Sequence, residues 1–248
     1  MLIEVVTLFP EMIREALQHG IVGRAQKRGL LCVGTENPRA HTQDVHHTVD
    51  DRPYGGGPGM VMKPEPLGAA IAAASQRLPA GSVRIALSAQ GRTLTHARVC
   101  ELAGAPGLLL VAGRYEGIDE RVLEAEVDLE VSIGDYVVSG GELPALVLID
   151  AVARQLPGAL GDERSAQQES FSAGLLDWPH YTRPEEYGGR WVPPVLLSGD
   201  HAAIERWRLK QALGRTWLRR RELLADRRLD AQHAVLLQEF LREQGSET

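Results

Sequence analysis

Short apolar runs alternate with segments of helical period along the first two thirds of the chain. The apolar runs predict strands at Met1–Leu8, Leu30–Thr35, Val83–Ser88, Leu108–Ala112 and Val127–Ile133. The intervening segments predict helices at Pro10–His19, Val22–Arg28, Pro64–Arg77, Thr95–Ala103, Asp119–Glu124 and Pro144–Gln155. Alternation of this kind implies a parallel sheet with helices on both faces. The pattern therefore predicts an α/β fold, and by itself it favours a Rossmann-like topology.

Two glycine-rich loops follow successive strands of this expected sheet. They are Gly113–Arg121 and Ser132–Pro144, and each carries a tyrosine and a carboxylate. The carboxyl ends of parallel strands meet at one edge, so the loops are expected to form two walls of one pocket, with Ser88–Gly91 as a third. Neither loop matches a P-loop or a dinucleotide pattern. Glycine backbone, apolar side chains and acids favour a cationic or zwitterionic ligand that carries an aromatic base; the alternative is a pair of ordinary strand-to-helix loops.

The chain between Glu36 and Met62 lacks either period. Long irregular segments in compact domains are usually functional or disordered. Within it, Asp50–Gly59 combines charged residues with a glycine-rich hinge, a composition that suits a mobile cover over a site. The alternative is a surface loop without function.

The pattern changes again after the first 156 residues. Residues 157–176 have no hydrophobic period and are predicted to be a flexible linker. Helices are then expected from an N-cap at Asp200 to Trp217 and from Asp230 to Glu243. We therefore predict a sheet domain at 1–156 and a small all-helical domain at 177–248.

Composition predicts a globular cytoplasmic protein. Hydrophobic residues make up 44% of the 248 residues, enough for a substantial core. The two cysteines match no metal spacing, so neither a disulfide framework nor a zinc site is expected. No apolar run reaches the roughly 18 residues of a membrane span, so no membrane association is expected.

Charge is distributed unevenly along the chain. The net charge is −6, and residues 1–175 hold 15 basic and 22 acidic residues. Residues 201–228, in contrast, hold 9 basic and 3 acidic residues. This asymmetry can place a polyanion on the C-terminal helices, although a solvated amphipathic face has the same composition.

Four long motifs carry a resemblance to a known family. They are DDRPYGGGPGM, GRYEGIDER, SIGDYVVSGGELP and LLDWPHYTRP, at residues 50–60, 113–121, 132–144 and 175–184. In this order and spacing the chain resembles the TrmD family of bacterial tRNA (guanine-N1)-methyltransferases, of the SPOUT superfamily, from Leu8 to Arg220.

This resemblance implies a trefoil knot in the sheet domain, S-adenosylmethionine as cofactor and tRNA as partner. The implied reaction methylates N1 of guanosine 37, immediately 3′ of the anticodon. It further implies a homodimer with composite active sites, in which the linker and C-terminal domain of one subunit complete the knotted domain of the other. A magnesium requirement is implied as well, but no motif in the sequence points to a metal site.

The resemblance also assigns site residues. Cofactor binding falls to Leu87, Ser88, Gly113, Tyr115, Glu116, Gly117, Ile133, Gly134, Asp135, Tyr136, Val137, Val138, Gly140, Gly141 and Pro144. Contacts to tRNA fall to Asp50, His180, Arg183, Arg208, Lys210, Arg215, Arg219 and Arg220.

Two catalytic roles follow from the same resemblance. Glu169 occupies the position of a family aspartate before a Ser-Phe pair and is the expected general base, with Asp177 and Asp50 as further candidates. Arg154 is expected to stabilise charge on guanine O6; its alternative role is to balance a helix dipole. Two other functions stay open: a SPOUT enzyme that methylates a ribose 2′-hydroxyl, and a non-enzymatic RNA-binding protein with the same fold.

Overall fold

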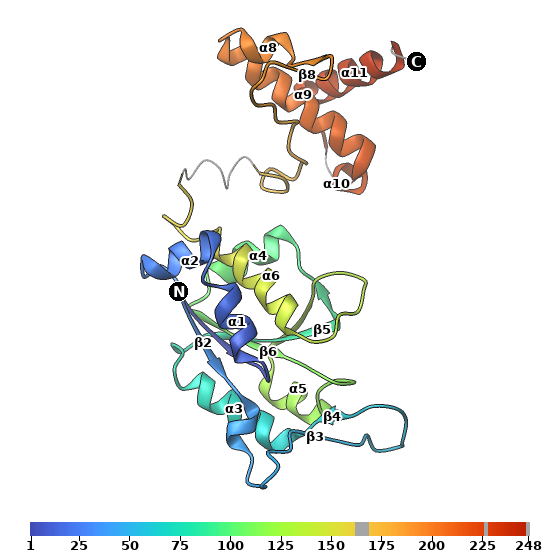
Figure 1. The fold of residues 1–248 in the computed structure, drawn as a ribbon. Helices are drawn as coiled ribbons and strands as arrows, with labels where there is room; N and C mark the ends of the chain where they lie inside the picture. Colours follow the sequence, from blue (N-terminus) through green and yellow to red (C-terminus); the bar gives the residue numbers. More distant parts are fainter. Residues whose placement is uncertain (162–168, 226–227, 247–248) are drawn as a thin grey trace. The chain divides into compact units, whose positions relative to one another are not determined.

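The protein folds into two compact units. The computed structural model describes residues 1–161, 169–225 and 228–246, and its contacts divide the chain into Met1–Glu163 and Arg164–Thr248 (Figure 1). Each unit has a hydrophobic core of its own. The predicted linker includes residues 162–168, which lie outside the described residues.

A five-stranded parallel sheet forms the centre of the first unit. Its strands are β1 (Leu2–Val6), β2 (Cys32–Glu36), β5 (Val83–Thr93), β6 (Gly107–Ala112) and β7 (Leu129–Ser132). They lie in the order β2-β1-β6-β5-β7, and every neighbouring pair is parallel. The central strand β6 is buried throughout, as expected for a parallel sheet covered on both faces. The predicted parallel α/β sheet is confirmed.

Helices cover both faces of this sheet (Figure 1). One face carries α1 (Pro10–Ala16), α2 (Gly20–Lys27), α4 (His96–Ala103) and α6 (Glu142–Ala153); the other carries α3 (Pro64–Ser75) and α5 (Glu120–Glu126). Alternate side chains of β6 point to the two faces. Leu108 and Leu110 pack with the first group of helices, whereas Leu109 and Val111 pack with the second. Two separate hydrophobic clusters therefore hold the layers together.

Strand β5 runs further than the sequence pattern indicates. The expected end at Ser88 was wrong, because the strand continues to Thr93. A register shift between Leu87 and Arg92 lets the chain rejoin β7, where Arg92 pairs with Val131. Gly91 permits this return: a Cβ there would lie 2.5 Å from the backbone of β7.

The segment expected to be irregular contains three short elements. They are the 3₁₀ helix η1 (Pro38–His41) and the strands β3 (Asp50–Asp51) and β4 (Val61–Met62), which pair antiparallel. An ordered pair of strands therefore brackets the glycine-rich stretch.

The second unit is mostly helical. It contains α8 (Pro194–Leu197), α9 (His201–Arg219), α10 (Glu222–Ala225) and α11 (Ala231–Ser246). Asp200 caps α9 as expected, because its carboxylate accepts a hydrogen bond from the Ala203 N–H at 3.0 Å.

A small hairpin departs from the expected all-helical architecture. Strands β8 (Glu186–Tyr187) and β9 (Arg190–Trp191) pair antiparallel. Gly188 and Gly189 both have positive φ, at 58° and 76°, which is the backbone of a tight two-residue turn.

Two helical glycines differ in the space around them, which gives a test of the helix packing. A Cβ on Gly214 in α9 would lie 2.3 Å from the Phe240 ring of α11. Gly214→Ala should therefore destabilise the second unit by about 1–3 kcal/mol through overpacking, despite the better helix propensity of alanine. All four tryptophans lie in this unit, so their fluorescence during urea unfolding reports on it.

Gly68 in α3 is the matched control, because a Cβ there meets nothing within 4 Å. Gly68→Ala should stabilise the first unit by about 0.5–1 kcal/mol, measured by circular dichroism over the same urea range. An equal gain in stability from Gly214→Ala would contradict the close packing of α9 on α11.

Candidate active site

A cavity of about 380 Å³ opens at the carboxyl ends of β5, β6 and β7. Three segments form its walls: residues 86–90, residues 113–118 and residues 130–141. These are the irregular middle part of β5 and the two glycine-rich loops that follow β6 and β7. Ligand sites in parallel sheets occupy this edge, because backbone groups and loop side chains converge there.

Fourteen of the fifteen residues predicted to bind a cofactor line this cavity. They are Leu87, Ser88, Gly113, Tyr115, Glu116, Gly117, Ile133, Gly134, Tyr136, Val137, Val138, Gly140, Gly141 and Pro144. The exception, Asp135, is exposed and is not among the lining residues. The fold therefore brings together positions up to 57 residues apart in the sequence.

The two glycine-rich walls are in direct backbone contact. The Gly141 N–H donates a hydrogen bond to the Gly113 carbonyl at 2.8 Å. A Cβ on Gly141 would lie 2.5 Å from the Ala112 Cα. Only a residue without a side chain allows this approach, so the width of the cavity depends on Gly141.

Acidic side chains predominate over basic ones around the cavity. Glu116, Glu120 and Glu130 contribute to the walls, and Arg114 is the single Lys or Arg among the residues that line it. The Nε of Arg114 already donates to the buried carboxylate of Glu142 at 2.8 Å. The remaining acids favour a ligand with a positive charge.

Arg114 and Glu142 were missed as site residues by the sequence reasoning. Both lie inside recognised motifs, but an acid in the first turn of a helix is an ordinary dipole partner. The position of Glu142 directly after two glycines, in a helix whose only other charged residue is Asp150, was the available signal.

The glycine-rich segment Asp50–Gly59, which the sequence predicts to be a cover, leads to residues that lie against the cavity wall formed by residues 113–118. The Glu116 N–H donates to the Met60 carbonyl at 2.9 Å, and the Met62 N–H donates to the Gly117 carbonyl at 2.9 Å. A Cβ on Gly59 would clash with the Glu116 side chain. The absence of a side chain at Gly59 thus lets the glycine-rich segment lie close to Glu116.

Asp50, predicted to contact tRNA, forms a hydrogen bond with Tyr115 of the cavity wall. Burial and a hydrogen bond to the Asp50 carboxylate raise the pKa of the Tyr115 phenol above its ordinary value. Arg39 of η1 also reaches this phenol, with its Nη2 at 3.5 Å from the oxygen. Asp50 therefore connects the cover to the cavity wall.

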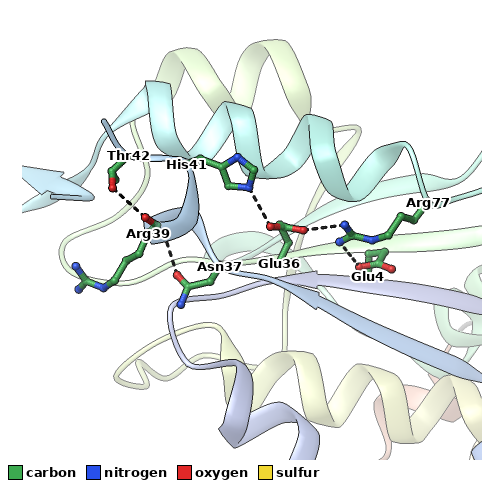
Figure 2. Close-up of polar contacts among 7 residues, drawn as sticks. All are labelled: Glu4, Glu36, Asn37, Arg39, His41, Thr42 and Arg77. Carbon is green, nitrogen blue, oxygen red and sulfur yellow. Dashed lines mark hydrogen bonds and ion pairs between the residues drawn. The ribbon is translucent and has the colours of Figure 1, made fainter. Parts of the chain in front are cut away.

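An ion cluster fastens η1 to the sheet (Figure 2). Arg77 donates to the carboxylates of Glu4 and Glu36 at 2.7 and 2.8 Å, and the His41 imidazole lies 2.9 Å from the other Glu36 oxygen. Burial opposes ionisation of Glu36, but the hydrogen bonds from His41 and Arg77 outweigh it and lower the pKa of that carboxyl. The cluster thus fixes the start of the segment whose Arg39 contacts the cavity.

Comparison with known proteins identifies the family. A family model described as tRNA (Guanine-1)-methyltransferase TrmD matches residues 1–226. The chain belongs to this family.

Individual relatives are similar over nearly their whole length. A protein of Methylococcus capsulatus (strain ATCC 33009 / NCIMB 11132 / Bath) is 60% identical over 240 residues, which cover 97% of this chain and 96% of the relative. A protein of Serratia marcescens is 61% identical over 98% of this chain and 95% of its own. One of Pseudomonas entomophila (strain L48) is 61% identical over 97% and 96%. All three are named tRNA (guanine-N(1)-)-methyltransferase.

The two residues with predicted catalytic roles belong to different units of this TrmD family member. Arg154 is the C-cap of α6 in the first unit, and its N–H donates to the Asp150 carbonyl at 3.1 Å. Glu169 belongs to the second unit, where it contributes to a cavity of about 580 Å³ together with Trp178 and Arg208. Their roles in catalysis stay predictions.

Several residues predicted to bind tRNA form ion pairs within the second unit. His180 lies 2.8 Å from Asp177, Arg208 lies 2.8 Å from Glu205, and Lys210 lies 2.6 Å from Glu243. Arg220 pairs with Glu222, whereas Arg183 and Arg219 are exposed and Arg215 is half-buried. The exposed pairs of His180 and Arg220 are worth only about 0–1 kcal/mol, so a phosphate can replace the acid at little cost, whereas the Lys210 side chain is mostly buried.

Within residues 1–161, 169–225 and 228–246, no group of three or more His, Cys, Asp or Glu side chains is placed to hold a metal ion. No described helix is both long and apolar enough to cross a lipid bilayer.

Crowding at Gly141 gives a test of the cavity. The φ and ψ of this residue, −75° and −5°, suit alanine, so Gly141→Ala adds only the clash with Ala112 and Gly113. We expect the Kd for S-adenosylmethionine, measured by isothermal titration calorimetry, to rise at least tenfold. Gly161→Ala is the control, since a Cβ there meets nothing within 4 Å. Unchanged affinity in Gly141→Ala would show that the contact between the walls does not shape the site.

The ion cluster predicts a pH dependence of stability. Because the pKa of Glu36 is lowered from 4.5, its contribution is present above that pH and is lost as pH falls through the folded value. Arg77→Gln removes a main cause of the lowered pKa. The difference in melting temperature between wild type and Arg77→Gln should therefore be largest above pH 5 and should narrow below pH 4.

The exposed pair of Arg98 and Glu101 on α4 supplies the control for this comparison. Arg98→Gln should change the melting temperature little at any pH. A gap between wild type and Arg77→Gln that stays constant from pH 3 to pH 7 would disprove the role assigned to the cluster.

Proposed function

We propose that this protein transfers a methyl group from S-adenosylmethionine to N1 of guanosine 37 in tRNA, next to the anticodon. The observation that carries the proposal is the sequence identity of about 60%, over nearly the whole chain, to proteins named tRNA (guanine-N(1)-)-methyltransferase. The cavity supports it independently, because a chain assigned to the TrmD family gathers the expected cofactor residues around one space.

The residues of the cavity suit this cofactor chemically. Leu87, Ile133 and Val138 offer apolar surface to an adenine ring, and the glycine loops bring backbone N–H and C=O groups within reach of its polar edge. S-adenosylmethionine supplies an electrophilic methyl group on a sulfonium, and the acidic walls favour that positive charge. A volume of about 380 Å³ lies within the range of small-molecule sites.

Methylation at guanine N1 requires removal of a proton, because N1 is protonated at neutral pH. We assign this step to the Glu169 carboxylate as general base. Arg154 then stabilises the negative charge that develops on O6, since a guanidinium is always protonated and donates in a plane. Asp177, whose carboxylate engages His180 at 2.8 Å, is the second candidate for the base.

The assignment places the two catalytic residues on different units, which a composite site in a homodimer accommodates. In this proposal, the sheet domain (residues 1–156) of one subunit works with the linker (157–176) and helical domain (177–248) of its partner. The trefoil knot expected of SPOUT enzymes involves the strands and loops that line the cavity. We propose that the enzyme is cytoplasmic. We also propose that the reaction requires magnesium, for which we assign no protein ligands.

Recognition of tRNA falls to the second unit and to the cover. Arg208, Lys210, Arg215, Arg219 and Arg220 all lie on or next to α9, where they can track a phosphate backbone. His180 and Arg183 flank Tyr181, which is exposed, and this grouping suits stacking on bases together with phosphate contacts. Asp50 contributes to tRNA recognition beside the cavity, where its carboxylate forms a hydrogen bond with Tyr115.

Single-turnover methyl transfer to unmodified tRNA with guanosine at position 37 tests the function. Wild type should form 1-methylguanosine, identified by mass spectrometry of nucleosides, and tRNA with adenosine at position 37 should stay unmethylated. Glu169→Gln should lose about 10²–10⁴ of the rate, and Glu169→Asp should retain much of it. Glu186→Gln, at an exposed acid of the hairpin, is the matched control.

Each rival function has its own outcome in this experiment. A ribose 2′-O-methyl product would indicate the other SPOUT activity, and tRNA binding without any methylation would indicate a non-enzymatic RNA-binding protein. An active Glu169→Gln variant would move the base to Asp177 or Asp50.

A further inference from the structure

A single buried carboxylate joins three segments at the edge of the cavity. The Glu142 side chain is fully buried and accepts hydrogen bonds from Thr7 Oγ1 and from Arg114 Nε, both at 2.8 Å. Thr7 follows β1, Arg114 belongs to the first glycine-rich wall, and Glu142 begins α6 directly after the second wall. Glu142 itself is not among the residues that line the cavity.

Arg114 is held on its other sides as well. Its Nη1 donates to the Ser139 carbonyl of the second wall at 3.1 Å, and its guanidinium carbon lies 4.4 Å from the centre of the Phe9 ring. A planar guanidinium can satisfy a carboxylate, a carbonyl and an aromatic face at the same time. The arginine therefore connects both walls with a fixed geometry.

Gly140 accommodates this arrangement. A Cβ at Gly140 would fall 2.2 Å from Arg114 Nε, so any side chain there would displace the guanidinium. Thr7 is oriented in the same way from the other side, because its Oγ1 accepts the Phe9 N–H at 2.9 Å while it donates to Glu142. Each partner of the carboxylate is thus held in place by a second contact.

Even when it is paired and hydrogen-bonded, as Glu142 is, a buried carboxylate contributes little net stability over an apolar side chain of similar size, so stability alone does not favour it at this position. Its contacts instead fix the separation of two loops that have few side chains of their own to pack. The N-terminus of α6 adds a favourable interaction with its charge.

We propose that Glu142 is a positioning residue that acts through Arg114 to set the distance between the two walls of the cofactor cavity. Its role is to determine cofactor affinity, without contact with the reacting atoms. The identity of the ligand, S-adenosylmethionine, rests on the proposed function.

Cofactor affinity in the full-length protein tests this role. Glu142→Gln keeps the shape of the side chain but removes its negative charge and one of the two oxygens that accept from Thr7 and Arg114, so we expect the Kd for S-adenosylmethionine to rise at least tenfold. The methylation rate at saturating cofactor should change less than threefold. Hydrogen exchange of residues 132–141 should increase in the same variant.

A double-mutant cycle separates a positioning pair from a merely structural contribution. Arg114→Gln should weaken binding to a similar degree, and the double variant should bind no worse than either single variant, because the two groups act as one unit. Exchange of the exposed pair Arg98 and Glu101 for glutamines is the control and should leave the Kd unchanged.

Gly140→Ala keeps the proposal testable if Glu142→Gln fails to fold. This substitution lies in a loop, where the added Cβ displaces the Arg114 side chain and leaves the buried carboxylate unchanged. It should also raise the Kd at least tenfold. Wild-type affinity in folded Glu142→Gln or Gly140→Ala, or a loss of rate at saturation with an unchanged Kd, would overturn the proposal.

The binding measurement also separates this inference from the proposed function. A wild-type protein that binds S-adenosylmethionine but methylates no tRNA would refute the proposed function and leave the effect of Glu142 on the Kd to decide the inference. A wild-type protein that binds no S-adenosylmethionine would overturn both.

Discussion

The close approach of Gly141 to the backbone of Ala112 and Gly113 is the constraint on which the cavity depends. A Cβ at Gly141 would lie 2.5 Å from the Ala112 Cα, and the Gly141 N–H donates a hydrogen bond to the Gly113 carbonyl at 2.8 Å. The loops that follow β6 and β7, two strands separated by β5 in the sheet, are thereby in contact at their bases. The cavity opens beyond this contact, with backbone groups exposed on both of its walls.

Two clusters of charged residues stabilise the surroundings of this cavity in different ways. The carboxylate of Glu142 is fully buried and holds Arg114 between the walls, so both groups depend on their pairing. The cluster of Arg77 with Glu4 and Glu36 is partly exposed, and it fastens η1 beside the sheet. From there Arg39 reaches Tyr115 in the cavity wall. The segment between η1 and β4 is thus held at its start by this ion cluster and at its end by the hydrogen bond from the Glu116 N–H to the Met60 carbonyl.

The second unit presents its positive charge in partly neutralised form. Lys210 and Arg206 of α9 pair with Glu243 and Glu239 of α11, so the excess of basic residues counted in the sequence is reduced on the folded surface. The pair of Arg206 is largely exposed and therefore weak in water, whereas the Lys210 side chain is mostly buried. In the proposed function, the acid-lined cavity of the first unit binds the cationic cofactor, and the arginine-rich second unit binds the anionic RNA.

The sequence by itself determined the layers of the first unit and most of the cavity. The continuous apolar run of β6 and the glycine clusters after two strands are local patterns, and the parallel order of the strands then brings the loops to one edge. Only the tertiary structure decided the extension of β5 to Thr93, the pairing of Glu142 with Arg114 and the contact of Asp50 with Tyr115. These features join residues distant in sequence whose types are ordinary for their local elements. No local period records them, because a register shift or a buried ion pair depends on which backbone lies opposite.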